Sequence, residues 1–140
     1  MPISDVLIRI SQSDDGRTRA NTASKWEPII GYSRAVRAGN LIAVTGTVGI
    51  NLDGTYPKTA AEQTRRALQI IEASLDALGA KLSQVVRTRM FVTDISQWEQ
   101  IGRVHGEIFA DMRPATTMVQ VVKLIDDAAM VEVEADAVVG

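Results

Sequence analysis

The sequence predicts a two-layer α+β sandwich, in which two helices cover one face of a mixed, largely antiparallel β-sheet. Three observations support this fold class. Apolar and β-branched residues alternate with the period of strands along residues 41–48, 85–93, 113–124 and 130–139. Two other stretches, 60–78 and 96–112, carry apolar residues at helical spacing. The helical stretches are separated by strands, so both helices can cover one face of a single sheet.

The chain of 140 residues is 46% apolar, which suits one domain over residues 1–140 and is too short to suggest two. Residues 1–25 are expected to form an N-terminal strand and loop extension. Val6 to Ile10 is typical of a short strand, and Asp14-Asp15-Gly16 is a turn signal within a polar stretch. The extension is therefore either an edge hairpin or a loose arm.

A hairpin and a capped helix follow. The turn Gly39-Asn40 separates two β-type runs, which predicts a hairpin. Thr59 and Glu62 have the spacing of a capping box, in which the threonine accepts a hydrogen bond from a free backbone amide at the start of a helix. Gly79 is expected to end that helix.

The strand at 85–93 has two different faces, one of which carries Arg87 and Arg89. Ser96 and Glu99 then form another capping-box pattern at the start of the second helix. The apolar stripe of that helix includes Trp98, Ile101, His105 and Met112. His105 is the one histidine of the chain, so we expect a core residue with one hydrogen bond rather than a catalyst. No multi-histidine metal site is possible, and a site that combines His105 with carboxylates is the remaining metal alternative.

The last predicted strand places Glu132, Glu134 and Asp136 on one face, because strand side chains alternate with period two. Three neighbouring carboxylates repel one another unless they are paired. This face must therefore meet water, a ligand or cations from elsewhere in the fold. Arginines of the strand at 85–93 would serve if they lay directly across from the carboxylates.

Composition excludes several classes of protein. No stretch approaches the roughly 18 consecutive apolar residues of a membrane span, and no basic-then-apolar leader begins the chain. We therefore expect a soluble cytoplasmic protein with no membrane partner. The absence of cysteine excludes disulfides and thiolate chemistry. A net charge of -2 disfavours a nucleic-acid partner, which a basic patch would indicate.

Several of these features occur together in one known family. Pro114-Ala115 before a β run, the segment Val-Glu-Val-Glu-Ala at 131–135, the Gly39-Asn40 hairpin and the strand end at 91–94 resemble the RidA/YjgF family over residues 28–139. Its members are enamine and imine deaminases, earlier described as endoribonucleases (L-PSP) or translation inhibitors. The resemblance implies a chorismate mutase-like fold and a homotrimer whose sheets form a central barrel. It also implies a small-molecule ligand in each intersubunit cleft and neither a metal nor another cofactor.

The resemblance also implies roles for individual residues. Glu132 would be catalytic, holding the attacking water together with the backbone carbonyl of Met118. Tyr32 and Thr45 would lie near the ligand. Active deaminases carry, after the Pro-Ala pair, an arginine that binds the substrate carboxylate, and Thr116 stands there in this chain. Threonine offers one donor and no charge. No 2-iminobutanoate deaminase activity is therefore expected, and an anionic substrate would have to meet Arg89, Arg87 or Arg34.

Three functions follow from the sequence. The first is an imine or enamine hydrolase with altered substrate specificity. The second is a non-catalytic regulatory trimer that binds a metabolite. The third is an endoribonuclease or translation inhibitor, which the net charge and the single histidine do not support independently.

Overall fold

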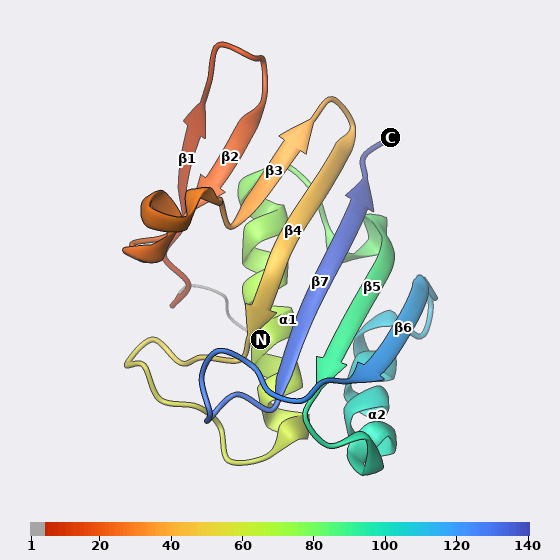
Figure 1. Cartoon of the computed structure of the whole chain (residues 1–140). Coiled ribbons are helices and arrows are strands. Elements are labelled where there is room, and N and C mark those ends of the chain that lie inside the picture. Colours follow the sequence, from red (N-terminus) through yellow and green to blue (C-terminus); the bar gives the residue numbers. More distant parts are fainter. Residues whose placement is uncertain (1–4) are drawn as a thin grey trace.

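The structure, a computed structural model, describes residues 5–140 and contains one seven-stranded sheet with two α-helices. Figure 1 shows both helices behind the sheet, so the face toward the viewer is left without a helix. The predicted fold class is confirmed in this respect. The strands, in their order across the sheet, are β1 (Arg9–Gln12), β2 (Thr18–Asn21), β3 (Ala35–Ala38), β4 (Leu41–Val48), β7 (Val131–Val138), β5 (Val85–Val92) and β6 (Ala115–Gln120).

All neighbouring strands are antiparallel except β5 and β6, which are parallel. The sheet is therefore mixed, as predicted. The parallel pair exists because the chain crosses over from β5 to β6 through η3 (Ile95–Gln97) and α2 (Trp98–Phe109). A register shift between Val44 and Thr47 marks a β-bulge in β4 beside β7.

The core lies between the sheet and the helices. Val131, Val133, Ala135 and Ala137 of β7 are fully buried and alternate with three partly exposed acidic residues. α1 (Ala60–Ala77) packs against β4 and β7, with Leu68, Ile71 and Leu75 buried. We call the helix-free face of the sheet the open face. Among the residues the structure describes, no helix is both long and apolar enough to cross a membrane.

Helix caps agree with the sequence in one case of two. Thr59 accepts a hydrogen bond from the backbone amide of Glu62 at 3.1 Å, as expected of an N-cap. The predicted Ser96 cap is wrong. The side chain of Asp94 accepts a hydrogen bond from the amide of Ser96 at 3.0 Å and so caps a short 3-10 turn, which precedes the helix. The helix therefore starts at Trp98, whose side chain is 58% exposed rather than part of the buried stripe.

Of the two alternatives for the N-terminal extension, the edge hairpin is present over residues 9–21. Its first strand begins at Arg9, so the strand expected over Val6 to Ile10 is displaced toward the C-terminus. β1 and β2 pair antiparallel around a turn at Gly16, which has φ 80°. β2 continues the sheet onto β3. A five-residue π-helical turn, η1 (Glu27–Gly31), then projects beside the open face (Figure 1). η2 (Leu82–Gln84) is a short turn before β5.

Candidate functional site

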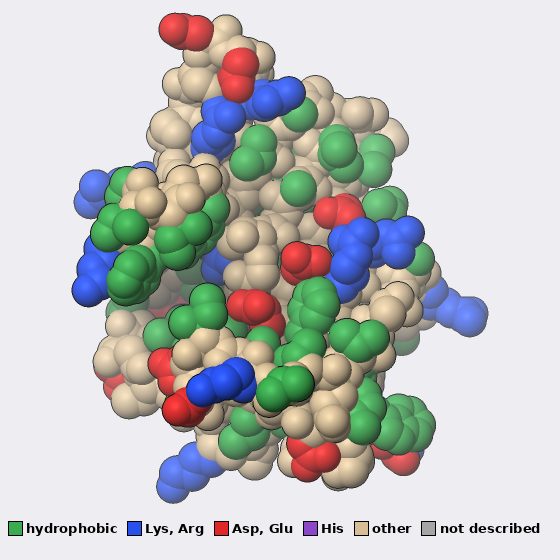
Figure 2. Space-filling view, viewed as in Figure 1, with side chains coloured by type: hydrophobic (Ala, Val, Ile, Leu, Met, Phe, Trp, Pro, Cys, Tyr) green, Lys and Arg blue, Asp and Glu red, His purple; other side chains and the backbone are tan. Residues whose placement is uncertain are grey.

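The open face carries a row of carboxylates along β7. Glu132, Glu134 and Asp136 alternate with buried apolar residues, so their side chains point away from the helices. Figure 2 shows acidic side chains in a row across this face. The predicted acidic row is thus present on the face that no helix covers.

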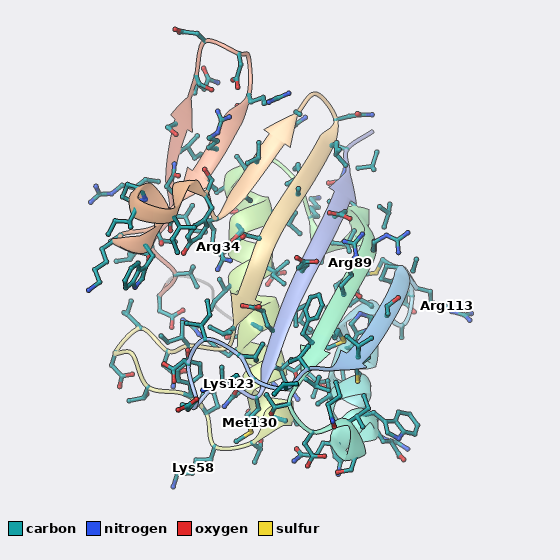
Figure 3. All side chains as sticks on the ribbon, in the orientation of Figure 1. Arg34, Lys58, Arg89, Arg113, Lys123 and Met130 are labelled. Carbon is teal, nitrogen blue, oxygen red and sulfur yellow. The ribbon has the colours of Figure 1, made fainter. Side chains whose placement is uncertain are left out.

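Arg89 of β5 neutralises part of this row. Its Nη1 lies 3.7 Å from Glu134 and 3.3 Å from Asp136, as expected for an arginine directly across from Glu134 in the ladder. Figure 3 shows Arg89 over β5 and β7. Phe91 stands opposite Glu132. Glu132 is therefore the member of the row that has no arginine across from it on β5.

Burial changes the acidity of Glu132. The side chain is half-buried, and desolvation raises the pKa of its carboxyl above the ordinary 4.5. Repulsion by Glu134 raises the pKa further, whereas Arg34 opposes both effects. A carboxylate with a raised pKa is a stronger base, which suits it to accept a proton from water.

The β-bulge of β4 makes room for this carboxylate. A Cβ atom added at Gly46 would lie 3.0 Å from Cδ of Glu132, so the carboxylate sits directly over a position without a side chain. Arg34 supports the same part of β4, because its Nη2 donates to the carbonyls of Gly46 at 2.9 Å and Thr45 at 3.3 Å. Glu132 and Arg34 thus both contact the bulged segment of β4 around Gly46.

Two hollows on the molecule contain Glu132, Tyr32, Thr45 and Arg89 of the candidate residues. The Glu132 hollow, of about 560 Å³, is lined by polar groups that include Tyr32, Arg34, Tyr56, Asp126 and Glu132. The Arg89 hollow, of about 900 Å³, is lined by Tyr32, Thr45, Arg89, Glu134 and Asp136, among others. Tyr32 lines both. Burial, with the charges of Asp126 and Glu132, raises the pKa of Tyr56, so its hydroxyl keeps its proton.

Thr116 and Met118 lie elsewhere. Thr116 Oγ1 is 2.8 Å from the hydroxyl of the fully buried Thr88 and 3.4 Å from Nε2 of His105, and it donates to the carbonyl of Pro114 at 3.2 Å. Its side chain therefore points to the helix side of β6. Met118 packs against the core on that same side. Within one chain, neither residue lines either hollow.

His105 belongs to the polar cluster beneath α2. Its Nε2 lies 2.9 Å from Thr88 Oγ1, and its ring centre lies 4.6 Å from that of Phe109. Burial lowers the pKa of its imidazole below the ordinary 6.5, so the neutral form prevails at neutral pH. No group of three or more histidine or acidic side chains among residues 5–140 is placed to hold a metal ion.

The fold places the chain in the class of two-layer α+β proteins in which two helices cover one face of a mixed sheet. A family model described as Endoribonuclease L-PSP matches residues 22–139. The chain belongs to this family, which is also called RidA or YjgF.

Two curated relatives are similar over most of their length. An uncharacterised protein of Streptomyces coelicolor is 33% identical over 120 residues, which make up 85% of this chain and 90% of the relative. The 2-iminobutanoate/2-iminopropanoate deaminase of Escherichia coli K12 is 31% identical over 111 residues, covering 76% of this chain and 86% of the relative.

Solved structures have the same fold. A member of the YjgF/YER057c/UK114 family from Mycobacterium tuberculosis has a TM-score of 0.82 at 48% identity, over 88% of this chain and 99% of that one. The structure of TdcF from Escherichia coli, solved with bound serine, has a TM-score of 0.73 at 26% identity, over 78% of this chain and 88% of that one.

Proposed function

We propose that this chain hydrolyses a small imine or enamine and that Glu132 is the general base. The observation that carries the proposal is the recessed carboxylate of Glu132, whose pKa burial raises and which lines a hollow large enough for a small metabolite. A family relative that is named as an imine deaminase supports the same reaction class.

The reaction needs one water and one proton shuttle. Glu132 accepts a proton from the water as its oxygen attacks the carbon of the C=N bond. The same carboxyl then returns the proton to nitrogen, and the tetrahedral adduct breaks down to a carbonyl compound and ammonia. A general base that is only half-buried can both exchange its proton with solvent and keep the raised pKa that favours this transfer.

The expected specificity differs from that of the deaminase relative. Thr116 carries no positive charge, and its hydroxyl is engaged with Thr88. A substrate carboxylate would find no partner there comparable to an arginine. We therefore expect little activity on 2-iminobutanoate held by its carboxylate at position 116, and Thr45, Tyr32 and Arg89 are further candidates for ligand contact.

We further propose that the complete site lies between subunits of a homotrimer. Thr116 and Met118 lie on the far strand of the sheet and line neither hollow of their own chain. A neighbouring copy that covered the open face would bring its own β6 toward Glu132. This arrangement would unite residues that one chain keeps apart.

Glu132→Gln tests the base directly. We expect ammonia release from imines generated in the assay to fall at least about 100-fold, because glutamine cannot accept the proton. Asp136→Asn is the matched control, since it removes a carboxylate from the same face and strand that does not act on the pKa of Glu132, and it should leave activity within a few-fold. Equal rates for Glu132→Gln and wild type would exclude Glu132 as the base.

A metabolite-binding protein without turnover is the alternative, and the TdcF structure with bound serine favours it. That reading predicts that serine raises the melting temperature in a saturable way while no product forms. Ammonia release from any imine tested would refute it.

The endoribonuclease named in the family description is a third possibility. It predicts RNA binding that weakens with salt. The acidic row on the open face opposes such binding. Failure to bind RNA at low ionic strength would exclude the endoribonuclease function.

A further inference from the structure

We propose that Arg34 is the anion-binding residue of the Glu132 hollow, so that the ligand carries a carboxylate or another small anionic group that meets β3 and β4. The inference rests on the proposed function, because it assigns a chemical class to the substrate of that site. Figure 3 shows Arg34 beside β4, on the side of η1.

The other arginines of the two hollows already have carboxylate partners. In the Glu132 hollow, Arg66 pairs with Asp5 at 3.0 Å. In the Arg89 hollow, Arg19 pairs with Asp15 at 3.2 Å, and Arg89 pairs with Glu134 and Asp136. Among residues 5–140, Arg34 is the arginine of these hollows that forms no ion pair.

The donors of Arg34 are only partly used. Nη2 donates to two backbone carbonyls, and no described residue accepts from Nε or Nη1. Nε is the one buried side-chain nitrogen or oxygen of residues 5–140 that has no hydrogen-bond partner. Nε is shielded from solvent, whereas Nη1, which also has no partner, stays accessible. Buried polar groups in proteins are nearly always paired, so a guanidinium with two unpaired nitrogens beside a hollow is suited to bind an acceptor through Nη1. A carboxylate is the group that the planar fork of an arginine binds best.

The acidic neighbours of Arg34 do not form ion pairs with its guanidinium. Glu27 accepts hydrogen bonds from the amide and the hydroxyl of Thr22, the former at 3.1 Å. Glu132 influences Arg34 through charge but forms no ion pair with it. Arg34 thus holds a positive charge within the range of Glu132 while its remaining donors stay free for a ligand.

This placement couples the two residues. An anion bound to Arg34 would offset the positive charge that lowers the pKa of Glu132 and would itself repel the carboxylate. A bound anionic substrate therefore makes Glu132 a stronger base than it is in the free protein. The arginine would select the substrate and also assist the proton transfer.

The experiment compares propanoate with propanamide, which match in shape and differ in charge. NMR titration of the full-length protein with each compound measures its equilibrium affinity, and the two affinities give the ratio. We expect wild type to favour propanoate by at least about tenfold, as for a charged hydrogen bond, and Arg34→Gln to bring the ratio close to one.

Arg37→Gln is the matched control. Arg37 lies on β3 and also donates to backbone carbonyls, at 2.7 Å to Leu78 and 2.9 Å to Gly39, but it points to the helix side. Its replacement should leave the ratio unchanged. If Arg34→Gln fails to fold, the Nε–H resonance of Arg34 in wild type serves instead, and it should shift with propanoate and not with propanamide.

Each outcome decides the inference without reference to turnover. A wild type without preference for propanoate, an Arg34→Gln variant that keeps the preference, or an Arg34 resonance that does not respond would overturn the role of Arg34. Imine hydrolysis by wild type would still decide the proposed reaction separately. A preference lost only in Arg34→Gln would support the inference even if no imine were turned over.

Discussion

Glu132, the proposed general base, lowers the stability of the fold at neutral pH. Its carboxyl titrates in the folded protein above the ordinary 4.5 because burial disfavours the charge. Between the two pKa values, the folded chain holds a proton that the unfolded chain has lost. The free energy of unfolding therefore decreases as pH rises through this window, and the loss persists above it. Residues placed for chemistry often carry such a cost.

Glu132→Gln should therefore stabilise the protein above the window and have little effect below it. We expect a gain on the order of 0.5 kcal/mol at about pH 8, kept small because half of the side chain stays near solvent and Arg34 offsets part of the penalty. Urea unfolding at about pH 4 and about pH 8 measures the difference. A Glu132→Gln variant less stable than wild type at pH 8 would contradict the proposed effect of burial.

Single residues of the site were predictable to different degrees. Strand alternation predicted that Glu132 shares one face with Glu134 and Asp136, whereas its role as the base came from the family resemblance. The arginine across from the acidic row also followed, and the structure pairs Arg89 with Glu134 and Asp136. Arg34 was one of three arginines considered for an anion. Arg89 is paired with Glu134 and Asp136, and Arg87 is exposed and lines neither hollow. The position of Gly46 beneath Glu132 depends on a bulge that no local pattern indicated.

At the scale of elements, the side chain of Gln63 in α1 binds two loops to this helix by hydrogen bonds. Its Nε2 donates to the carbonyls of Pro57 and Ala128, both at 3.0 Å, and its Oε1 accepts from the amide of Met130 at 2.8 Å. The side chain is fully buried. One amide group thus joins the loop before the helix to the loop before β7, which also contributes Asp126 to the Glu132 hollow.

Gln63→Leu should destabilise the protein by about 2 to 3 kcal/mol, because three backbone groups would lose their partner at a buried position. Gln69→Leu is the control on the same helix, since the one side-chain hydrogen bond that Gln69 forms among residues 5–140, accepted from Arg66, is a marginal 3.5 Å. It should change stability by less than about 0.5 kcal/mol. Denaturant unfolding of both variants gives the comparison, and equal losses would argue against this role of Gln63.

The sequence indicated Gln63 poorly, for a physical reason. A glutamine in a helix is ordinarily solvent-exposed, and only contacts with residues 128 and 130, far along the chain, make this one structural. The limits of β6 were missed in the same way. Residues 113–124 alternate throughout, but the strand ends at Gln120, after which Val122 is fully exposed. Strand ends depend on the neighbours in the sheet, which local periodicity does not specify.

At the scale of the whole molecule, composition and periodicity did not resolve what covers the open face of the sheet. Two helices were predicted to cover one side, and they do. The other side exposes Leu41 at 47%, Val119 at 42% and Val138 at 36%, each at the position where alternation turns it away from the core. Apolar residues grouped on one side of a sheet typically mark a protein contact. Alternation predicts this face, whereas the expectation that three copies meet on it came from the family resemblance alone.

We expect this face to be covered by other copies in a homotrimer, and Val119→Lys should disrupt the assembly. A lysine on β6 would bring a charge into an apolar contact, where its desolvation is unfavourable. Trp98→Lys is the control, because Trp98 is 58% exposed on the helix side of the molecule. Light scattering coupled to size-exclusion chromatography should give three chains for wild type and Trp98→Lys, and smaller particles for Val119→Lys. If wild type itself runs as a monomer, the far β6 strand cannot bring Thr116 and Met118 to Glu132, and the proposed site reduces to the hollow around Arg34.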